Sequence, residues 1–361
     1  MIEYENLSKA NQPYWEEFVA SFRDTLGEGW FILGKRVEQF EEEFAAYCGV
    51  KYCVGVASGF DALVLSLRAL RLEDGDEVIL PSNTYVATVL AVIQAGLTPV
   101  LVEPDPESYN IDPNRIEERI TKRTKVILPV HLYGKPCVMD RLQGLSTSRG
   151  IHLVEDCAQA HGARFGKTMA GSFGSLSAFS FYPTKNLGAL GDGGAVVTND
   201  PALATAVRQL RNYGSEKKYD TVMLGVNSRL DELQAGFLRI KLRKLDAIIE
   251  HKRSLARLYQ EGLKDAFVKP AVRPDEHDVY HIYAIRHPQR DKLREYLLKH
   301  GIRTEIHYPV PPHQQPSLRN FFAGESYPLS EEIHRTILSL PISTFHTPGD
   351  IGRVIDVLNG F

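Results

Sequence analysis

The sequence predicts an α/β fold: a large domain with a mostly parallel sheet between helices, and a smaller C-terminal α+β domain. Between residues 50 and 200, short apolar runs alternate with helical or loop segments, which is typical of a parallel sheet buried on both faces. Beyond Pro270 the elements become shorter and mixed. A chain of 361 residues is long enough for about two domains. We expect the large domain, with an N-terminal arm, over 1–245 and the small domain over 246–361.

The expected strands of the large domain are apolar runs bounded by turns. They lie at 52–56, 77–80, 100–102, 125–130, 152–154 and 195–199. The uncharged stretch 81–102 contains Gln94, Gly96, Thr98 and Pro99, so it predicts a helix followed by a strand and not a membrane span.

A long connecting helix, straight or bent, is expected next, over 229–263, because apolar residues recur there near helical spacing. The small domain follows with mixed elements. They are a strand over 280–286, a helix over 290–300, a strand over 302–307 and then short helices.

Composition excludes several classes of function. The formal charge of -3 and a pI near 6.5 leave no basic surface for nucleic acid or for an anionic membrane. The four cysteines form no CxxC pair, and the first ten residues lack the apolar core of a signal peptide, so we expect a cytoplasmic protein. Cys157 and His161 have no further Cys or His at a useful spacing, and we expect no metal site.

Lys185 follows an expected strand in the segment SFYPTKNLGALGDGGAVVTND (180–200). A lysine amine at such a place forms a Schiff base with an aldehyde cofactor when desolvation or nearby cations lower its pKa. A single lysine, however, is more often a surface charge. The glycines that follow resemble a dinucleotide loop, but GxGxxG needs a helix after it, and AVVTN predicts a strand. We expect these glycines to let the backbone pack closely beside the lysine.

The segment HLVEDCAQAHGA (152–163) places two acids at the end of an apolar strand, where α/β sheets carry their ligand sites. Asp156 is suited to pair with a protonated pyridine nitrogen, and Gln159 could hydrogen-bond a phenolic oxygen on the same ring. An acid that caps a loop is an equally good interpretation of Asp156.

The junction ASGFDAL (57–63) leads from a strand into an amphipathic helix. Free backbone N–H groups and the positive helix end attract anions, and Ser58 and Gly59 permit close approach of a phosphate. A serine here can also be a plain N-cap. Tyr85, in PSNTYVAT (81–88), offers an aromatic ring beyond a strand end, with core packing as the alternative.

A Schiff-base lysine, a pyridinium acid, a phosphate junction and a stacking ring are together the parts of a pyridoxal 5'-phosphate (PLP) site. Nearly the whole chain resembles the DegT/DnrJ/EryC1/StrS family of PLP-dependent nucleotide-sugar aminotransferases. The similar runs are GWFILGKRVEQFEEEFAAYCGV, SGFDAL, GDEVILPSNTYVAT, VHLYG, EDCAQAHGA, SFYPTKNLGALGDGGAV, RNYG, GVNSRLDELQAG and IHYPVPPHQQ. The resemblance implies the type I aminotransferase fold and a homodimer with shared active sites.

The same resemblance implies roles for single residues. Lys185 matches the lysine that holds the cofactor, Asp156 the pyridinium partner and Gln159 the residue at the phenolic oxygen. The implied phosphate and stacking positions are Ser58, Gly59, Phe60, Tyr85 and Ser180, with Asn227 reaching in from the partner subunit. Phe60 stands where the family commonly has Thr, which removes a hydroxyl and keeps the backbone N–H.

The run KNLGALGDGGA resembles the branch of the family that aminates a 3-oxo sugar, whereas 4-aminating members more often have a Thr-rich turn ending in GEGG. The implied substrates are a dTDP-linked 3-oxo-6-deoxyhexose and L-glutamate. Arg229 is a candidate for the diphosphate, because a guanidinium forks onto phosphate oxygens. Tyr219, His307 and Tyr308 are candidates for the rest of the cleft, with ordinary packing or surface exposure as the alternative.

Three other functions compete with this one. A 4-aminotransferase would act on a dTDP- or UDP-linked 4-oxo sugar. A dehydratase of the same fold has His where this chain has Lys185. A non-catalytic PLP-binding regulatory protein would belong to another class, and no basic helix-turn-helix segment supports it.

Overall fold

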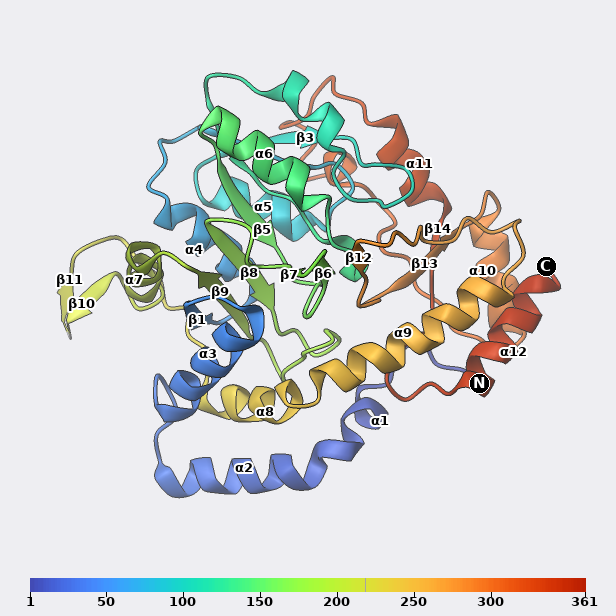
Figure 1. The fold of residues 1–361 in the computed structure, drawn as a ribbon, viewed down its shortest axis with the longest axis horizontal. Helices are drawn as coiled ribbons and strands as arrows, with labels where there is room; N and C mark the ends of the chain where they lie inside the picture. Colours follow the sequence, from blue (N-terminus) through green and yellow to red (C-terminus); the bar gives the residue numbers. More distant parts are fainter. Residues whose placement is uncertain (218) are drawn as a thin grey trace.

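The large domain is centred on a seven-stranded sheet, seen in a computed structural model that describes residues 1–217 and 219–361 (Figure 1). The strand order is β1-β9-β8-β5-β4-β2-β3. Strand β9 runs antiparallel to its neighbours β1 and β8, and the other pairs are parallel. The bounds are β1 (Tyr52–Val56), β2 (Glu77–Pro81), β3 (Thr98–Val102), β4 (Thr124–Ile127), β5 (His152–Asp156), β8 (Leu176–Ser180) and β9 (Gly194–Thr198). The predicted mostly parallel sheet is confirmed.

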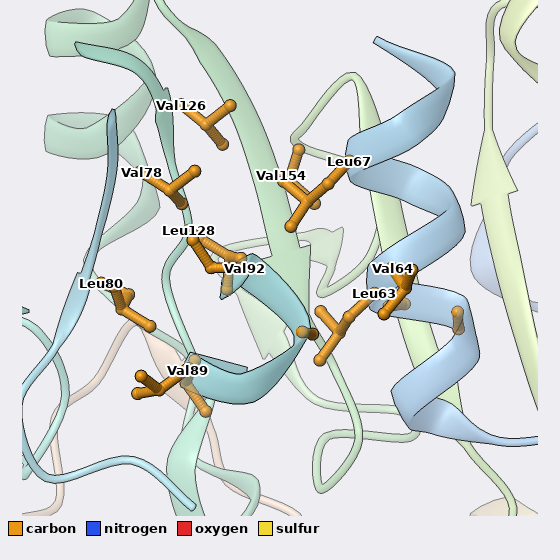
Figure 2. Close-up of a cluster of buried hydrophobic side chains, with 14 of the residues drawn as sticks. Leu63, Val64, Leu67, Val78, Leu80, Val89, Val92, Val126, Leu128 and Val154 are labelled. Carbon is orange, nitrogen blue, oxygen red and sulfur yellow. The ribbon is translucent and has the colours of Figure 1, made fainter. Parts of the chain in front are cut away.

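Helices cover both faces of this sheet. They are α3 (Lys35–Cys48), α4 (Gly59–Ala69), α5 (Val86–Gln94), α6 (Met139–Arg149) and α7 (Pro201–Leu210). Alternate residues of β2 show why its sequence is continuously apolar: Val78 and Leu80 join one buried cluster and Ile79 joins another. Figure 2 shows Leu63 and Leu67 of α4 in the first of these clusters. The helix and strand predicted within 81–102 are confirmed as α5 and β3.

The smaller elements of the large domain lie at its edges. They are α1 (Leu7–Asn11), α2 (Trp15–Glu28), β6 (Arg164–Phe165), β7 (Thr168–Met169), β10 (Ser215–Lys217), β11 (Asp220–Thr221) and the 3-10 turns Gln12–Tyr14, Pro113–Arg115, Glu117–Arg119 and Leu132–Gly134. Strands β6 and β7 form a three-stranded sheet with β12 (Glu276–His277). None of the helices described is both long and apolar enough to cross a bilayer.

The single long helix predicted over 229–263 is wrong. The chain forms α8 (Glu232–Leu242) and α9 (Leu245–Gly262), separated at Arg243 and Lys244. The first helix packs on α2 and α3 of the large domain, whereas α9 packs on α12 (Pro348–Asn359) of the small domain. Figure 1 shows the change of direction between them. Neither Gly236 nor Gly262 lies at the break. The two helices differ in their packing partners, although Leu245 and Ile249 at the start of α9 still join the large domain's apolar cluster.

The small domain contains β13 (Tyr283–Arg286) paired antiparallel with β14 (Ile337–Leu340). Its helices are α9, α10 (Arg290–Lys299), α11 (Pro328–Thr336) and α12, with a 3-10 turn at Pro312–Gln314. The strand predicted over 302–307 is wrong, because Ile302 bridges Ile2 while Glu305 bridges Ser339, so no continuous ladder forms. Ile2 also joins the small domain's apolar cluster, which fixes the N-terminus on that domain.

Candidate functional site

A cleft of about 540 Å3 lies at the carboxyl ends of the parallel strands, next to the start of α4. Ligands of open α/β sheets bind at this end of the strands. Most of the residues predicted from the sequence line it: Ser58, Gly59, Phe60, Tyr85, Asp156, Gln159, Ser180, Lys185, His307 and Tyr308. Residues from five separate segments therefore meet in one place.

Lys185 follows β8, in a turn where its backbone N–H donates to the carbonyl of Tyr182 at 2.8 Å. Its amine lies 3.5 Å from Nε2 of His281. Burial lowers the pKa of Lys185 to about 8, and the negative charge of Asp156 opposes that effect. The amine therefore has a sizeable neutral fraction near neutral pH, as a nucleophile or proton acceptor requires.

Asp156 ends β5 and is only 5% exposed. Its carboxylate accepts the backbone N–H of Ala158 at 3.0 Å and the hydroxyl of Thr88 at 2.9 Å. Burial raises the pKa of Asp156, while these two donors and Lys185 favour the carboxylate. Thr88 was missed by sequence reasoning, although it stands in the same PSNTYVAT segment as Tyr85.

The start of α4 has the features of an anion site. The side chain of Ser58 caps the helix by accepting the N–H of Asp61 at 3.1 Å, which leaves the first-turn N–H groups of Gly59 and Phe60 directed out of the helix. A Cβ on Gly59 would lie 2.5 Å from Cβ of Ser180, and one on Gly194 would lie 2.3 Å from the Ser58 carbonyl oxygen. Glycine at positions 59 and 194 therefore lets β8, β9 and α4 converge.

Gln159 and Tyr308 form a hydrogen-bonded wall of the cleft. Gln159 accepts the N–H of Tyr133 at 2.6 Å and donates to the Tyr308 hydroxyl at 2.8 Å. The rings of Tyr308 and Tyr85 are 4.9 Å apart, centroid to centroid. His307 is held by contact of its Nδ1 with the Ser339 hydroxyl at 2.8 Å. The roles of Gln159 and Tyr85 toward a cofactor ring stay predictions.

Three predicted residues do not line the cleft of the single chain: Tyr219, Asn227 and Arg229. Tyr219 is 91% exposed. Asn227 is exposed and its backbone bridges Asn212. The guanidinium of Arg229 donates to the Asn212 side chain at 2.9 Å and lies over the Tyr213 ring. Their roles in binding cofactor or substrate stay predictions.

Glu155, the acid beside Asp156, faces the other way into the protein. Its carboxylate accepts hydrogen bonds from Gly171 N, Phe173 N, Gly174 N, Ser177 Oγ and His131 Nε2. His131 Nδ1 accepts the N–H of Cys137, so Nε2 carries the proton. Glu155, His131 and Cys157 lie close enough to hold a metal, yet the carboxylate and imidazole are already used, and burial keeps the Cys157 pKa well above its usual range. This cluster supports the strand that carries Asp156.

Comparison with known proteins agrees with this arrangement. A model of the DegT/DnrJ/EryC1/StrS aminotransferase family matches residues 14–359. The chain is 48% identical to a dTDP-3-amino-3,6-dideoxy-alpha-D-galactopyranose transaminase of Aneurinibacillus thermoaerophilus, over 100% of this chain and 99% of the relative. It is 47% identical to a dTDP-3-amino-3,4,6-trideoxy-alpha-D-glucose transaminase of Streptomyces venezuelae, over 99% and 95%. The crystal structure of S. venezuelae DesV in complex with a ketimine intermediate superimposes with a TM-score of 0.97 at 46% identity, covering 99% of this chain and 98% of that one.

Proposed function

Because the chain belongs to the DegT/DnrJ/EryC1/StrS aminotransferase family, we propose that it transfers the amino group of L-glutamate to the 3-oxo group of a dTDP-linked 3-oxo-6-deoxyhexose. The product is a dTDP-3-amino-3,6-dideoxyhexose, made in the cytoplasm for deoxysugar biosynthesis. The observation that carries the proposal is that the desolvated Lys185 amine and the Asp156 carboxylate lie in one cleft.

Aminotransferases of this family depend on PLP, and the residues present fit that group. The Lys185 amine can bond to the aldehyde, and Asp156 keeps acceptor capacity beyond its two hydrogen bonds for a protonated ring nitrogen. The N–H groups at the start of α4 and the hydroxyl of Ser180 suit a phosphate. When bound, PLP supplies an electron sink for breaking bonds at the amino-bearing carbon.

The chain's own residues then have distinct tasks. Asp156 keeps the ring nitrogen protonated, because a buried carboxylate is stabilised by an adjacent positive charge. Lys185, once released, moves protons between the donor or sugar carbon and the cofactor, and its lowered pKa of about 8 suits both uptake and release. His307 and Tyr308 line the cleft, and we expect their side chains to contact the sugar.

Amination at the 3-position is supported by the two relatives, since both are named for 3-amino sugars carried on dTDP. They differ at C4, where the galactose derivative keeps a hydroxyl and the 3,4,6-trideoxy sugar has none. We therefore propose the 3-oxo group and the dTDP carrier without assigning the configuration at C4.

A homodimer with shared active sites is also part of this proposal. One side of α2 exposes Trp15, Val19, Phe22 and Leu26, each between 42% and 52% exposed and spaced along one helical stripe. Contiguous apolar surface of this kind marks an interaction site. Asn227 is exposed and does not line its own chain's cleft, which suits a residue that reaches a partner's cofactor phosphate.

A competition assay tests the function. The purified protein with PLP and L-glutamate is given equal amounts of dTDP-3-oxo-6-deoxyhexose and its 4-oxo isomer, and NMR locates the nitrogen in the product. We expect the 3-amino sugar, and a Lys185→Ala variant as the control should give none. Nitrogen at the 4-position would overturn the 3-oxo assignment. Absence of transfer across dTDP- and UDP-linked ketones and several amino donors would favour a non-catalytic protein.

A further inference from the structure

A second imidazole in the cleft, that of His281, faces the amine of the central lysine. Its Nε2 lies 3.5 Å from Nζ of Lys185. Its Nδ1 is buried and, within the described residues, has no hydrogen-bond partner. His281 comes from the small domain, just before β13, whereas Lys185 comes from the large domain. No motif in the sequence pointed to it.

The backbone of His281 is tied to the residue that follows Lys185. The buried ammonium of Lys252, on α9, donates to the carbonyl oxygen of His281 at 3.1 Å and to Oδ1 of Asn186 at 2.9 Å. Asn186 in turn donates from Nδ2 to the carbonyl oxygen of Val279 at 3.0 Å. Hydrogen bonds therefore connect the segment that carries the imidazole to the turn that carries the amine.

The opposite side of the same segment is fixed by the large domain. Val279 N donates to Gly134 O at 3.0 Å, and Ile282 N donates to Tyr133 O at 3.2 Å. Tyr280, between them, has a φ of 43°, in the left-handed region that bulky residues rarely adopt. This turn directs His281 into the cleft, and the surrounding hydrogen bonds hold the strained backbone in place.

His281 is chemically suited to face an amine that gains and loses a proton. Burial, helped by Lys185 and Lys252, lowers the pKa of His281 well below 6.5, so the ring is neutral. A neutral imidazole accepts from an ammonium through Nε2 and, as the other tautomer, donates to a free amine. The other titratable groups acting on the Lys185 amine or on this ring are Asp156 of β5, His161, His307 and Lys252 of α9. Asp156 favours the ammonium by charge alone.

We propose that His281 is a positioning residue whose Nε2 holds the amine of Lys185 at this wall of the cleft whenever that amine is not bonded to the cofactor. The proposal rests on the proposed function, in which the released lysine carries protons and must return to the same place. The separation of 3.5 Å is at the long limit for a hydrogen bond.

The test measures the titration of the Lys185 amine in the full-length protein freed of cofactor. Trace acetylation with acetic anhydride at a series of pH values, read by peptide mass spectrometry, gives its midpoint, expected at about 8. His281→Gln places an amide oxygen near the position of Nε2, whereas His281→Asn places its amide near Nδ1. Because an acceptor stabilises the ammonium, His281→Asn should lower the midpoint to about 7, and His281→Gln should keep it near the wild-type value.

Lys241 is the internal control in the same digest. Burial also lowers its pKa to about 8, but its amine donates to the carbonyl oxygen of Gly188, so its midpoint should not move in any variant. An unchanged Lys185 midpoint in His281→Asn, or equal falls in both variants, would overturn the proposal. If circular dichroism shows that His281→Asn does not fold, His281→Leu replaces it with the same two outcomes. No sugar substrate is used, so the result stands apart from success or failure of the transfer assay.

Discussion

The two threonine hydroxyls behind Asp156 form an ordered chain of hydrogen bonds. Oγ1 of Thr88 donates to Oδ2 of Asp156 at 2.9 Å, and the hydroxyls of Thr84 and Thr88 are 2.8 Å apart. A hydroxyl has one proton, and Thr88 gives its own to the carboxylate. Thr84 must therefore donate to the oxygen of Thr88, and the chain runs from Thr84 to Thr88 to Asp156.

The Thr88→Val variant removes the inner donor while keeping the shape of the side chain. A hydrogen bond to a charged group contributes about 1.5–3 kcal/mol. Burial already raises the Asp156 pKa, and loss of this donor should raise it by about one to two further pH units. A protonated Asp156 cannot pair with a protonated ring nitrogen. We therefore expect PLP affinity and turnover to fall about 10- to 100-fold, most strongly at low pH.

The assay titrates PLP into the cofactor-free variants from acid to neutral pH. Thr88→Ser restores the donor and should bind within about threefold of the wild type, because the hydroxyl returns to the same carboxylate. Thr84→Val removes only the outer link and should cost less than about tenfold. If Thr88→Val bound PLP with wild-type affinity over the whole range, the reasoning from the buried carboxylate would be refuted.

Three further outcomes are expected. Asp156→Asn should lower turnover severely at unchanged fold, since the ring nitrogen loses its charged partner; near-normal turnover would contradict this role. Mixed Lys185→Ala and Asn227→Ala subunits should recover up to about a quarter of wild-type activity, because half of the randomly paired dimers have one intact site; no recovery despite subunit exchange would count against shared sites. Glu155→Gln should lose about 3–5 kcal/mol of unfolding free energy, measured in urea, because its amide faces backbone donors. An unchanged urea midpoint would show that those hydrogen bonds do not stabilise the fold.

The sheet could be predicted from the sequence because each strand is a local feature. The run of residues 78–80 is apolar on both faces whatever its neighbours are, and β2 forms there as predicted. The break between α8 and α9 could not be predicted, since it depends on tertiary packing: α8 packs on α2 and α3, and α9 packs on α12. The same holds for Ile302 and Glu305, whose bridges go to Ile2 and to Ser339, far away in the sequence.

The residues of the candidate site also divide into those that a local motif predicts and those that depend on long-range contacts. Lys185 and the start of α4 follow strands, and Asp156 is the last residue of one. All three stand in segments that resemble the family at several positions, so motif reasoning found them. Thr88 and His281 act through a contact with a residue at least 68 positions away. No local sequence pattern indicates which residue either of them contacts. Only the folded chain brings Thr88 to Asp156 and His281 to Lys185.

The neighbouring acids at the end of β5 show how the fold assigns different tasks to equivalent residues. Successive side chains of a strand point to opposite faces, so Glu155 enters the core while Asp156 faces the cleft. A carboxylate offers about four acceptor sites. Glu155 accepts five hydrogen bonds, which lower its pKa despite burial and leave no capacity for a ligand. Asp156 accepts two, and burial raises its pKa, so it gains most from a further positively charged donor. The difference in unused acceptor capacity is the physical reason that Asp156, and not Glu155, is the candidate partner for a protonated ring nitrogen.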